Sequence, residues 1–140
     1  MNEDSLASKV FAKMYNYDGY SQWLGIELVN VSEGICSLQM TIRKDMLNGF
    51  QIAHGGITYS LADSALAFAS NSHGRMSVSI ETSISHTKSV KEGDVITAVA
   101  EQLSLTDKIG VYSVTIKNQL GETVALFKGT VYRTPKNWEV

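Results

Sequence analysis

The segment from Gly55 to Asn71 is apolar on nearly all sides and rich in alanine. A surface helix carries its apolar residues along one stripe, so this pattern instead predicts a helix that is buried all round. Small side chains also let neighbouring elements approach the helix closely. The rest of the chain is therefore expected to cover it.

Two-residue alternation of apolar and polar residues predicts strands on both sides of that helix. The expected strands are residues 24–28, 36–42, 76–85, 95–105, 111–117 and 124–132. In the third strand the apolar residues Met76, Val78, Ile80 and Ile84 take even positions, so we expect the even face to be buried. These elements predict an α+β fold in which an antiparallel sheet of five to six strands wraps around the central helix.

We expect residues 1–140 to form one domain, because the chain has no low-complexity stretch, no convincing internal repeat and a single proline, Pro135. Residues 1–23 are expected to be an N-terminal helical segment, with apolar residues near a 3.6-residue spacing between 6 and 14. Residues 135–140 are expected to be a loose C-terminal tail.

Charge balance and cysteine count limit the partners and the compartment. Twelve Lys and Arg against 14 Asp and Glu leave a formal net charge of −2, so nucleic acid is not an expected partner. Cys36 is the only cysteine, which excludes an intrachain disulfide and a thiolate-rich zinc site. With no secretory signal and no run of 18 apolar residues, we expect a cytoplasmic protein without a membrane partner.

Between residues 46 and 80 the only acidic side chain is Asp63 and the only Lys or Arg is Arg75. An unpaired buried carboxylate is costly, so Asp63 either pairs across the fold or faces a cleft. The alternative is a structural Asp that accepts hydrogen bonds from Asn, Ser or backbone donors. Asp63 is therefore a candidate functional residue.

The sequence His54-Gly55-Gly56 opens the predicted helix. The first N–H groups of a helix have no intrahelical partner, so they can bind an anion or a developing oxyanion. His54 and Asn48 lie where they can orient a ligand. In the alternative interpretation, the glycines make a tight turn that His54 caps. The other two histidines, His73 and His86, are expected to be structural.

Asp63 lies eight residues beyond Gly55, which is about 12 Å along a helix. A catalytic base must come within about 3 Å of its target or reach it through one water. If both residues serve one site, Asp63 must come from a second copy of the helix. This spacing predicts an obligate homodimer with two symmetric sites.

The candidate residues follow a fixed spacing: Asn48, five residues, His54-Gly55-Gly56, six residues and then Asp63. This pattern resembles that of the hotdog-fold acyl-CoA thioesterases, most closely the phenylacetate-degradation (PaaI-type) group. The resemblance covers nearly the whole chain. It implies a sheet wrapped around a central helix, dimers that assemble as a homotetramer, and hydrolysis of an aromatic (phenylacetyl-type) or medium-chain acyl-CoA to the acid and free CoA. It also implies that no metal and no cofactor takes part.

The resemblance assigns roles to several residues. The Gly55 N–H would stabilise the oxyanion, and His54 and Asn48 would orient the thioester or the attacking water. Asp63 of the partner chain would be the nucleophile or the general base. Ser79 is a candidate for orienting the water.

Contacts to the rest of the substrate are expected from two further groups. The candidates for binding CoA and its phosphates are Gly56, Lys88, Lys91, Lys128 and Arg133, with a solvated strand edge as the alternative for each basic residue. The candidates for lining the acyl pocket are Phe50, Ile57, Tyr59 and Leu61.

Two other functions fit the same pattern. One is a hotdog hydratase or dehydratase that acts on acyl thioesters, although its loop before the helix is typically proline-rich and residues 46–56 contain no proline. The other is a non-catalytic acyl-CoA-binding protein or scaffold that kept the fold. The presence of both Asp63 and His54 favours an enzyme.

Overall fold

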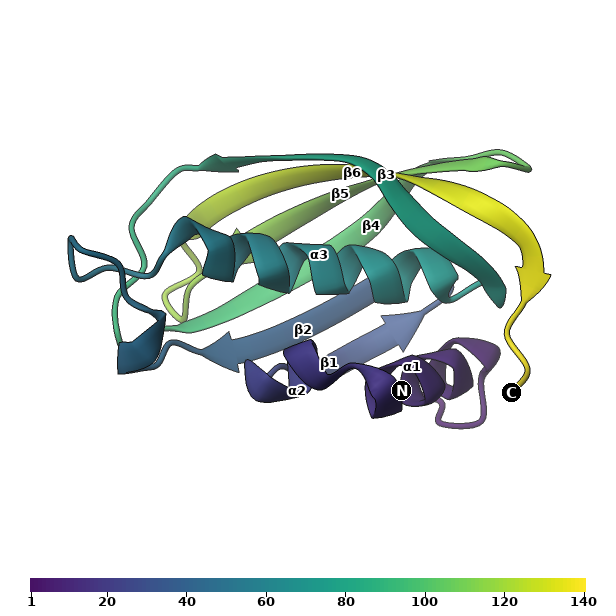
Figure 1. The fold of residues 1–140 in the computed structure, drawn as a ribbon, viewed down its shortest axis with the longest axis horizontal. Coiled ribbons are helices and arrows are strands. Elements are labelled where there is room, and N and C mark those ends of the chain that lie inside the picture. Colours follow the sequence, from purple (N-terminus) through teal and green to yellow (C-terminus); the bar gives the residue numbers. More distant parts are fainter.

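The computed structural model describes all residues from 1 to 140 (Figure 1). Its elements are α1 (Leu6–Tyr17), α2 (Gly19–Trp23), β1 (Glu27–Ser32), β2 (Ile35–Thr41), the 3-10 helix η1 (Lys44–Met46), α3 (Gly55–Asn71), β3 (Arg75–His86), β4 (Val95–Leu105), β5 (Ile109–Lys117) and β6 (Thr123–Asn137). No helix is both long and apolar enough to cross a membrane.

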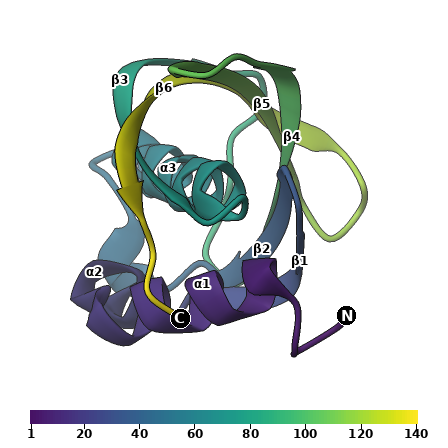
Figure 2. The same cartoon turned by 90° about the vertical axis from the view of Figure 1, so that its right-hand side faces the viewer.

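The six strands form one antiparallel sheet in the order β1-β2-β4-β5-β6-β3. Viewed along α3, the sheet curls around that helix, and α1 and α2 lie along the side that the sheet leaves uncovered (Figure 2). The predicted α+β hotdog arrangement is confirmed. Both ends of the strand order, β1 and β3, are free edges.

The core lies between α3 and the concave face of the sheet. Leu61, Ala62 and Ala65 of α3 are fully buried there, together with Ile96 and Ile116 of the sheet. Apolar burial of this kind is the main term that stabilises a domain of this size. The inward side of α3 is therefore fixed by packing against the sheet.

Gly129 of β6 is required by this close packing, because a β-carbon there would overlap the side chain of Leu66 on α3. Overpacking a core costs about 1–3 kcal/mol. We expect Gly129→Ala to lower the free energy of unfolding by that amount in urea denaturation. The control is Gly49→Ala, since a β-carbon at Gly49 meets no atom within 4 Å. Equal stability of the two variants would contradict this packing.

The even face of β3 is not continuously buried, so that prediction is wrong. Val78 and Ile80 are 56% and 58% exposed, whereas Ser77 is buried. Irregularities in the pairing with β6, between Arg75 and Ser77 and between Ser79 and Glu81, change which residues face inward along the strand. Beyond the second irregularity Ile84 again packs against the core.

Two further expectations need correction. The helix α3 is not buried all round, because Asp63 and Gly56 are exposed. The tail predicted for residues 135–140 begins inside β6, which extends to Asn137. The indole of Trp138 then donates a 2.8 Å hydrogen bond to Asn71 Oδ1, and this contact fixes the chain after the strand.

Candidate active site

The loop before α3 is shaped by Asn48. Its Oδ1 accepts hydrogen bonds from the backbone N–H groups of Phe50 at 2.9 Å and Ile52 at 3.4 Å. This turn places Gln51 at a φ of 60°, a left-handed conformation. The side-chain oxygen of Asn48 is therefore used by the loop, and its amide N–H groups have no partner in the chain and can donate to a ligand.

His54 caps α3 as the alternative interpretation predicted. Its Nδ1 accepts the Gly56 N–H at 2.9 Å, so a neutral ring carries its hydrogen on Nε2. The Gly56 N–H is consequently not free for a CoA phosphate, which corrects that candidate role. The Gly55 N–H has no hydrogen-bond partner in the chain. It is the free donor at the positive end of the helix dipole.

A cavity of about 390 Å³ lies at this end of α3. Asn48, Gly55 and Lys88, all predicted from the sequence, line it together with Thr58 and His86. Lys88 is the one basic candidate beside Gly55, and its Nζ forms an ion pair with Glu122 Oε2 at 3.0 Å. Hydrogen bonds from Asn118 and then Lys88 hold the pKa of the Glu122 carboxyl below its usual value.

His86 is the residue that the sequence analysis missed. Its Nδ1 lies 3.2 Å from Thr58 Oγ1, and its ring lies against Gly55. The pattern of β3 suggested a structural role because His86 continues the even face of the strand. One signal for it was present in the sequence. The even face of this strand carries the apolar residue Ile84, and the polar His86 two residues later marks the place where the core ends.

Asp63 neither pairs across the fold nor accepts a hydrogen bond. It lines a second cavity of about 240 Å³, and Ser79 lies on the same cavity. Partial burial, and secondarily the negative charge of Asp18, raise the pKa of the Asp63 carboxyl above its ordinary value. The carboxylate is thus a stronger base than one in water.

The raised pKa makes Asp63 a source of instability at neutral pH. The folded state disfavours the charged carboxylate. The free energy of unfolding therefore falls as pH rises from the ordinary carboxyl pKa through the higher pKa of the folded state. We expect Asp63→Asn to raise Tm by about 1–3 °C at pH 7. The difference should vanish at pH values below the ordinary carboxyl pKa of 3.8. A lower Tm of the variant at pH 7, measured by thermal denaturation, would contradict this.

The two cavities share no residue. Gly55 and Asp63 stand on one continuous helix, eight residues or about 12 Å apart. A single chain therefore holds an anion-binding helix start and, in the middle of the same helix, a carboxylate that does not meet it.

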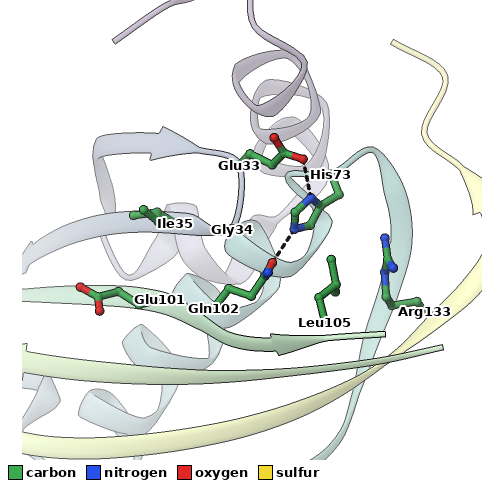
Figure 3. Close-up of a pocket in the computed structure, with 8 residues that line it drawn as sticks. All are labelled: Glu33, Gly34, Ile35, His73, Glu101, Gln102, Leu105 and Arg133. Atoms are coloured by element: carbon green, nitrogen blue, oxygen red, sulfur yellow. Dashed lines mark hydrogen bonds and ion pairs between the residues drawn. The ribbon is translucent and has the colours of Figure 1, made fainter. Parts of the chain in front are cut away.

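Two basic candidates lie elsewhere. Arg133 lines a cavity beside His73, just past the C-terminal end of α3 and thus at the opposite end of the helix from Gly55 (Figure 3). There Arg133 Nη1 donates to Thr106 O at 2.7 Å, and His73 bonds Glu33 and Gln102. Lys128 is exposed between the inward residues Phe127 and Gly129, and so faces the outside of the sheet. Neither reaches Gly55 of its own chain.

The remaining candidates divide by burial. Lys91 stands in the exposed turn before β4 and makes no side-chain ion pair. Ile57 and Leu61 belong to the core, and Phe50 is 87% exposed. Tyr59 packs edge-on against the ring of Phe127, with ring centroids 5.4 Å apart. The four acyl-pocket candidates therefore do not converge on one cavity within a single chain.

The residues present also bear on metal binding. No group of three or more His, Cys, Asp or Glu side chains is arranged to hold a metal ion.

The known proteins that the chain resembles in sequence and in structure include thioesterases. Residues 50–125 match the model of the thioesterase superfamily. The chain is 40% identical to the acyl-coenzyme A thioesterase PaaI of Escherichia coli over 86% of each chain. The solved structure of the E. coli PaaI protein, from the phenylacetic acid degradation operon, superimposes with a TM-score of 0.93 over 94% of this chain and 96% of that one at 37% identity.

A second solved structure carries a ligand. A protein of Streptococcus mutans with acetyl-CoA bound has a TM-score of 0.78 and 28% identity, covering 81% of this chain and 91% of that one.

Proposed function

The chain belongs to the thioesterase superfamily, and from this membership and the geometry around Gly55 and Asp63 we propose that it hydrolyses acyl-CoA thioesters at sites shared by two chains. The relative that is named an acyl-CoA thioesterase supports the enzyme class. The observation that carries the shared site is the split between a free Gly55 N–H and an unpaired Asp63 about 12 Å further along one helix.

The free edge of β3 supplies the surface for a second chain. Val78 and Ile80 are exposed on this edge strand, which is twelve residues long. An exposed apolar edge invites pairing with another strand. Antiparallel pairing of β3 with its copy would bring two α3 helices alongside each other in opposite directions. Asp63 of one chain would then face Gly55 of the other.

The chemistry follows from these two groups, the Gly55 N–H and the Asp63 carboxylate. Asp63 either deprotonates a water that attacks the thioester carbon or attacks that carbon itself. The carbonyl oxygen becomes an oxyanion and accepts the Gly55 N–H, while the Asn48 amide and His54 Nε2–H orient the reactants. Collapse of the intermediate breaks the carbon–sulfur bond and releases CoA as a thiolate, which takes its proton from the Asp63 carboxyl in the general-base route and from solvent in the nucleophile route. In the nucleophile route, water then hydrolyses the anhydride. Ser79 is proposed to orient the water.

The proposal extends to substrate and setting. An aromatic, phenylacetyl-type acyl group is favoured over a medium-chain one, since the E. coli relative comes from a phenylacetic acid degradation operon. Lys88 and Lys91 would bind CoA phosphates. The reaction would use no metal or cofactor, and the enzyme would work in the cytoplasm as a homodimer or as the homotetramer that the resemblance implies.

The test is release of free thiol from a panel of aromatic and medium-chain acyl-CoAs, followed with a chromogenic thiol reagent. We expect turnover with at least one aromatic member. The proposal would be overturned if no member of the panel released thiol faster than it does in buffer alone. The proposal would also be overturned if the protein bound CoA without turnover, or if it hydrated an enoyl-CoA without releasing thiol.

Sedimentation equilibrium tests the shared site. We expect a dimer or larger assembly at micromolar concentration. A fully active monomer would contradict a site built from two chains.

A further inference from the structure

The imidazole of His86 lies against the start of α3. Its Nε2 is 3.2 Å from the point that a β-carbon at Gly55 would occupy. The same ring lines the cavity of about 390 Å³ to which Gly55 and Asn48 belong. A β-carbon at position 55 would press on the ring, which would have to shift by a few tenths of an ångström. The ring edge thus stands beside the one free N–H at this helix end.

The contact with Thr58 bears on which ring nitrogen of His86 carries the hydrogen. The Thr58 hydroxyl lies 3.1 Å from Gly55 O, to which it can only donate, and 3.2 Å from His86 Nδ1, which either accepts the hydroxyl hydrogen or, as Nδ1–H, donates to Oγ1. When the hydroxyl donates to Nδ1, a neutral His86 carries its hydrogen on Nε2, the nitrogen that faces Gly55. Thr58 is buried and His86 is exposed, so this contact lies at the boundary between the core and the solvent.

An oxyanion site commonly aims more than one donor at the same oxygen. The next backbone N–H along the helix, that of Gly56, is already bound to His54 and is not available. We infer that neutral His86 supplies a donor beside Gly55: its Nε2–H, oriented by Thr58, donates to the thioester oxygen that also accepts the Gly55 N–H. This inference rests on the proposed thioesterase function. His86 would then be a catalytic residue and Thr58 a positioning residue.

Two substitutions at His86 separate the donor from the ring. His86→Phe keeps a flat ring without a donor, and His86→Gln keeps an amide N–H near the position of Nε2. We expect His86→Phe to lower kcat by about 30-fold with KM within twofold, because the hydrogen bond strengthens only as the oxyanion forms. His86→Gln should recover kcat to within about fivefold of wild type. A kcat of His86→Phe within twofold of wild type, or a change in KM alone, would overturn the inference.

Thr58→Val removes the hydroxyl and keeps the shape of the side chain. We expect a kcat loss of about fivefold, and no further loss when Thr58→Val is added to His86→Phe, because the hydroxyl acts through His86. Independent losses that multiply in the double variant would contradict that order of action. Thermal denaturation of each variant checks that the fold is intact.

A measurement on the wild-type protein needs no turnover. The ¹⁵N chemical shifts of the His86 ring are recorded with a ketone analogue of an acyl-CoA, in which a methylene replaces the thioester sulfur. We expect the Nε2–H tautomer in the complex, and the Nδ1–H tautomer would overturn the inference. If wild type released no thiol from any acyl-CoA but the analogue fixed the Nε2–H tautomer, the proposed function would fail while the donor role of His86 would stand.

Discussion

Asp63→Asn is expected to lower kcat for thiol release by about a thousandfold, whichever of its two roles Asp63 has. Asparagine keeps the size of the side chain and loses both the basic oxygen and the negative charge. KM should change little, since the substitution removes a group that acts in the reaction. The measurement is steady-state release of thiol from the best substrate of the acyl-CoA panel, at saturating concentration.

The matched control is Asp107→Asn, which makes the same change of charge at an exposed carboxylate paired with Arg75. Its kcat should stay within twofold of wild type. The raised pKa of Asp63 also sets a pH dependence: kcat/KM should fall as acid protonates the carboxylate, with a midpoint above the ordinary value of 3.8. A loss smaller than tenfold in Asp63→Asn would remove Asp63 from the chemistry.

Local periodicity was enough to place the main elements. The helix Gly55–Asn71 and the strand Val95–Leu105 begin and end at the residues expected from the sequence. Both are long segments whose burial pattern does not depend on a distant partner. The order of the strands in the sheet was not predicted, because alternation alone does not say which strands pair.

The register of β3 could not be read in this way. Alternation assumes a regular strand, whereas the pairing with β6 is interrupted near Ile80 and the facing side changes there. His86 was assigned a structural role because it continues the even face of the strand beyond Ile84. Only the curl of the sheet at the end of β3 brings that residue to Gly55. Gly55 and His86 are 31 positions apart in the sequence, and a local pattern of residues does not predict a contact over that separation.

The candidate site was predictable in part for a physical reason. The separation of Gly55 and Asp63 depends only on helix rise, so it followed directly from their spacing. The basic residues were chosen by their position after or within the later strands, and that choice ignores which side of the sheet each one occupies. Lys88 lies at the cavity around Gly55, whereas Lys128 points to the outside of the sheet.

Gly55→Pro is expected to lower kcat/KM by about 10²–10³-fold, because proline has no N–H to donate to the oxyanion and its ring fills the place of the oxygen. The helix should tolerate the change. Position 55 is the first residue of α3, where proline is favoured, and His54 has φ −58° and ψ 138°, which suit a residue before proline. The Gly55 N–H also has no partner to lose within the chain.

Gly55→Ala is the control, since it adds a β-carbon against His86 and keeps the N–H. The ring of His86 must then shift by a few tenths of an ångström, and we expect a loss of about fivefold or less. If alanine were as damaging as proline, crowding rather than the missing donor would explain both variants. Circular dichroism and Tm confirm that each variant folds before its rate is measured.

Mixing the Gly55→Pro and Asp63→Asn proteins decides whether one site draws on two chains. After joint refolding, about half of the dimers carry one chain of each kind. In such a dimer, the intact Asp63 of the Gly55→Pro chain meets the intact Gly55 of the Asp63→Asn chain, and the second site carries both lesions. Activity should therefore return to about a quarter of wild type, although each variant alone is nearly inactive. No recovery in a mixture that forms mixed dimers would mean that both residues act within one chain, which the 12 Å helix spacing argues against.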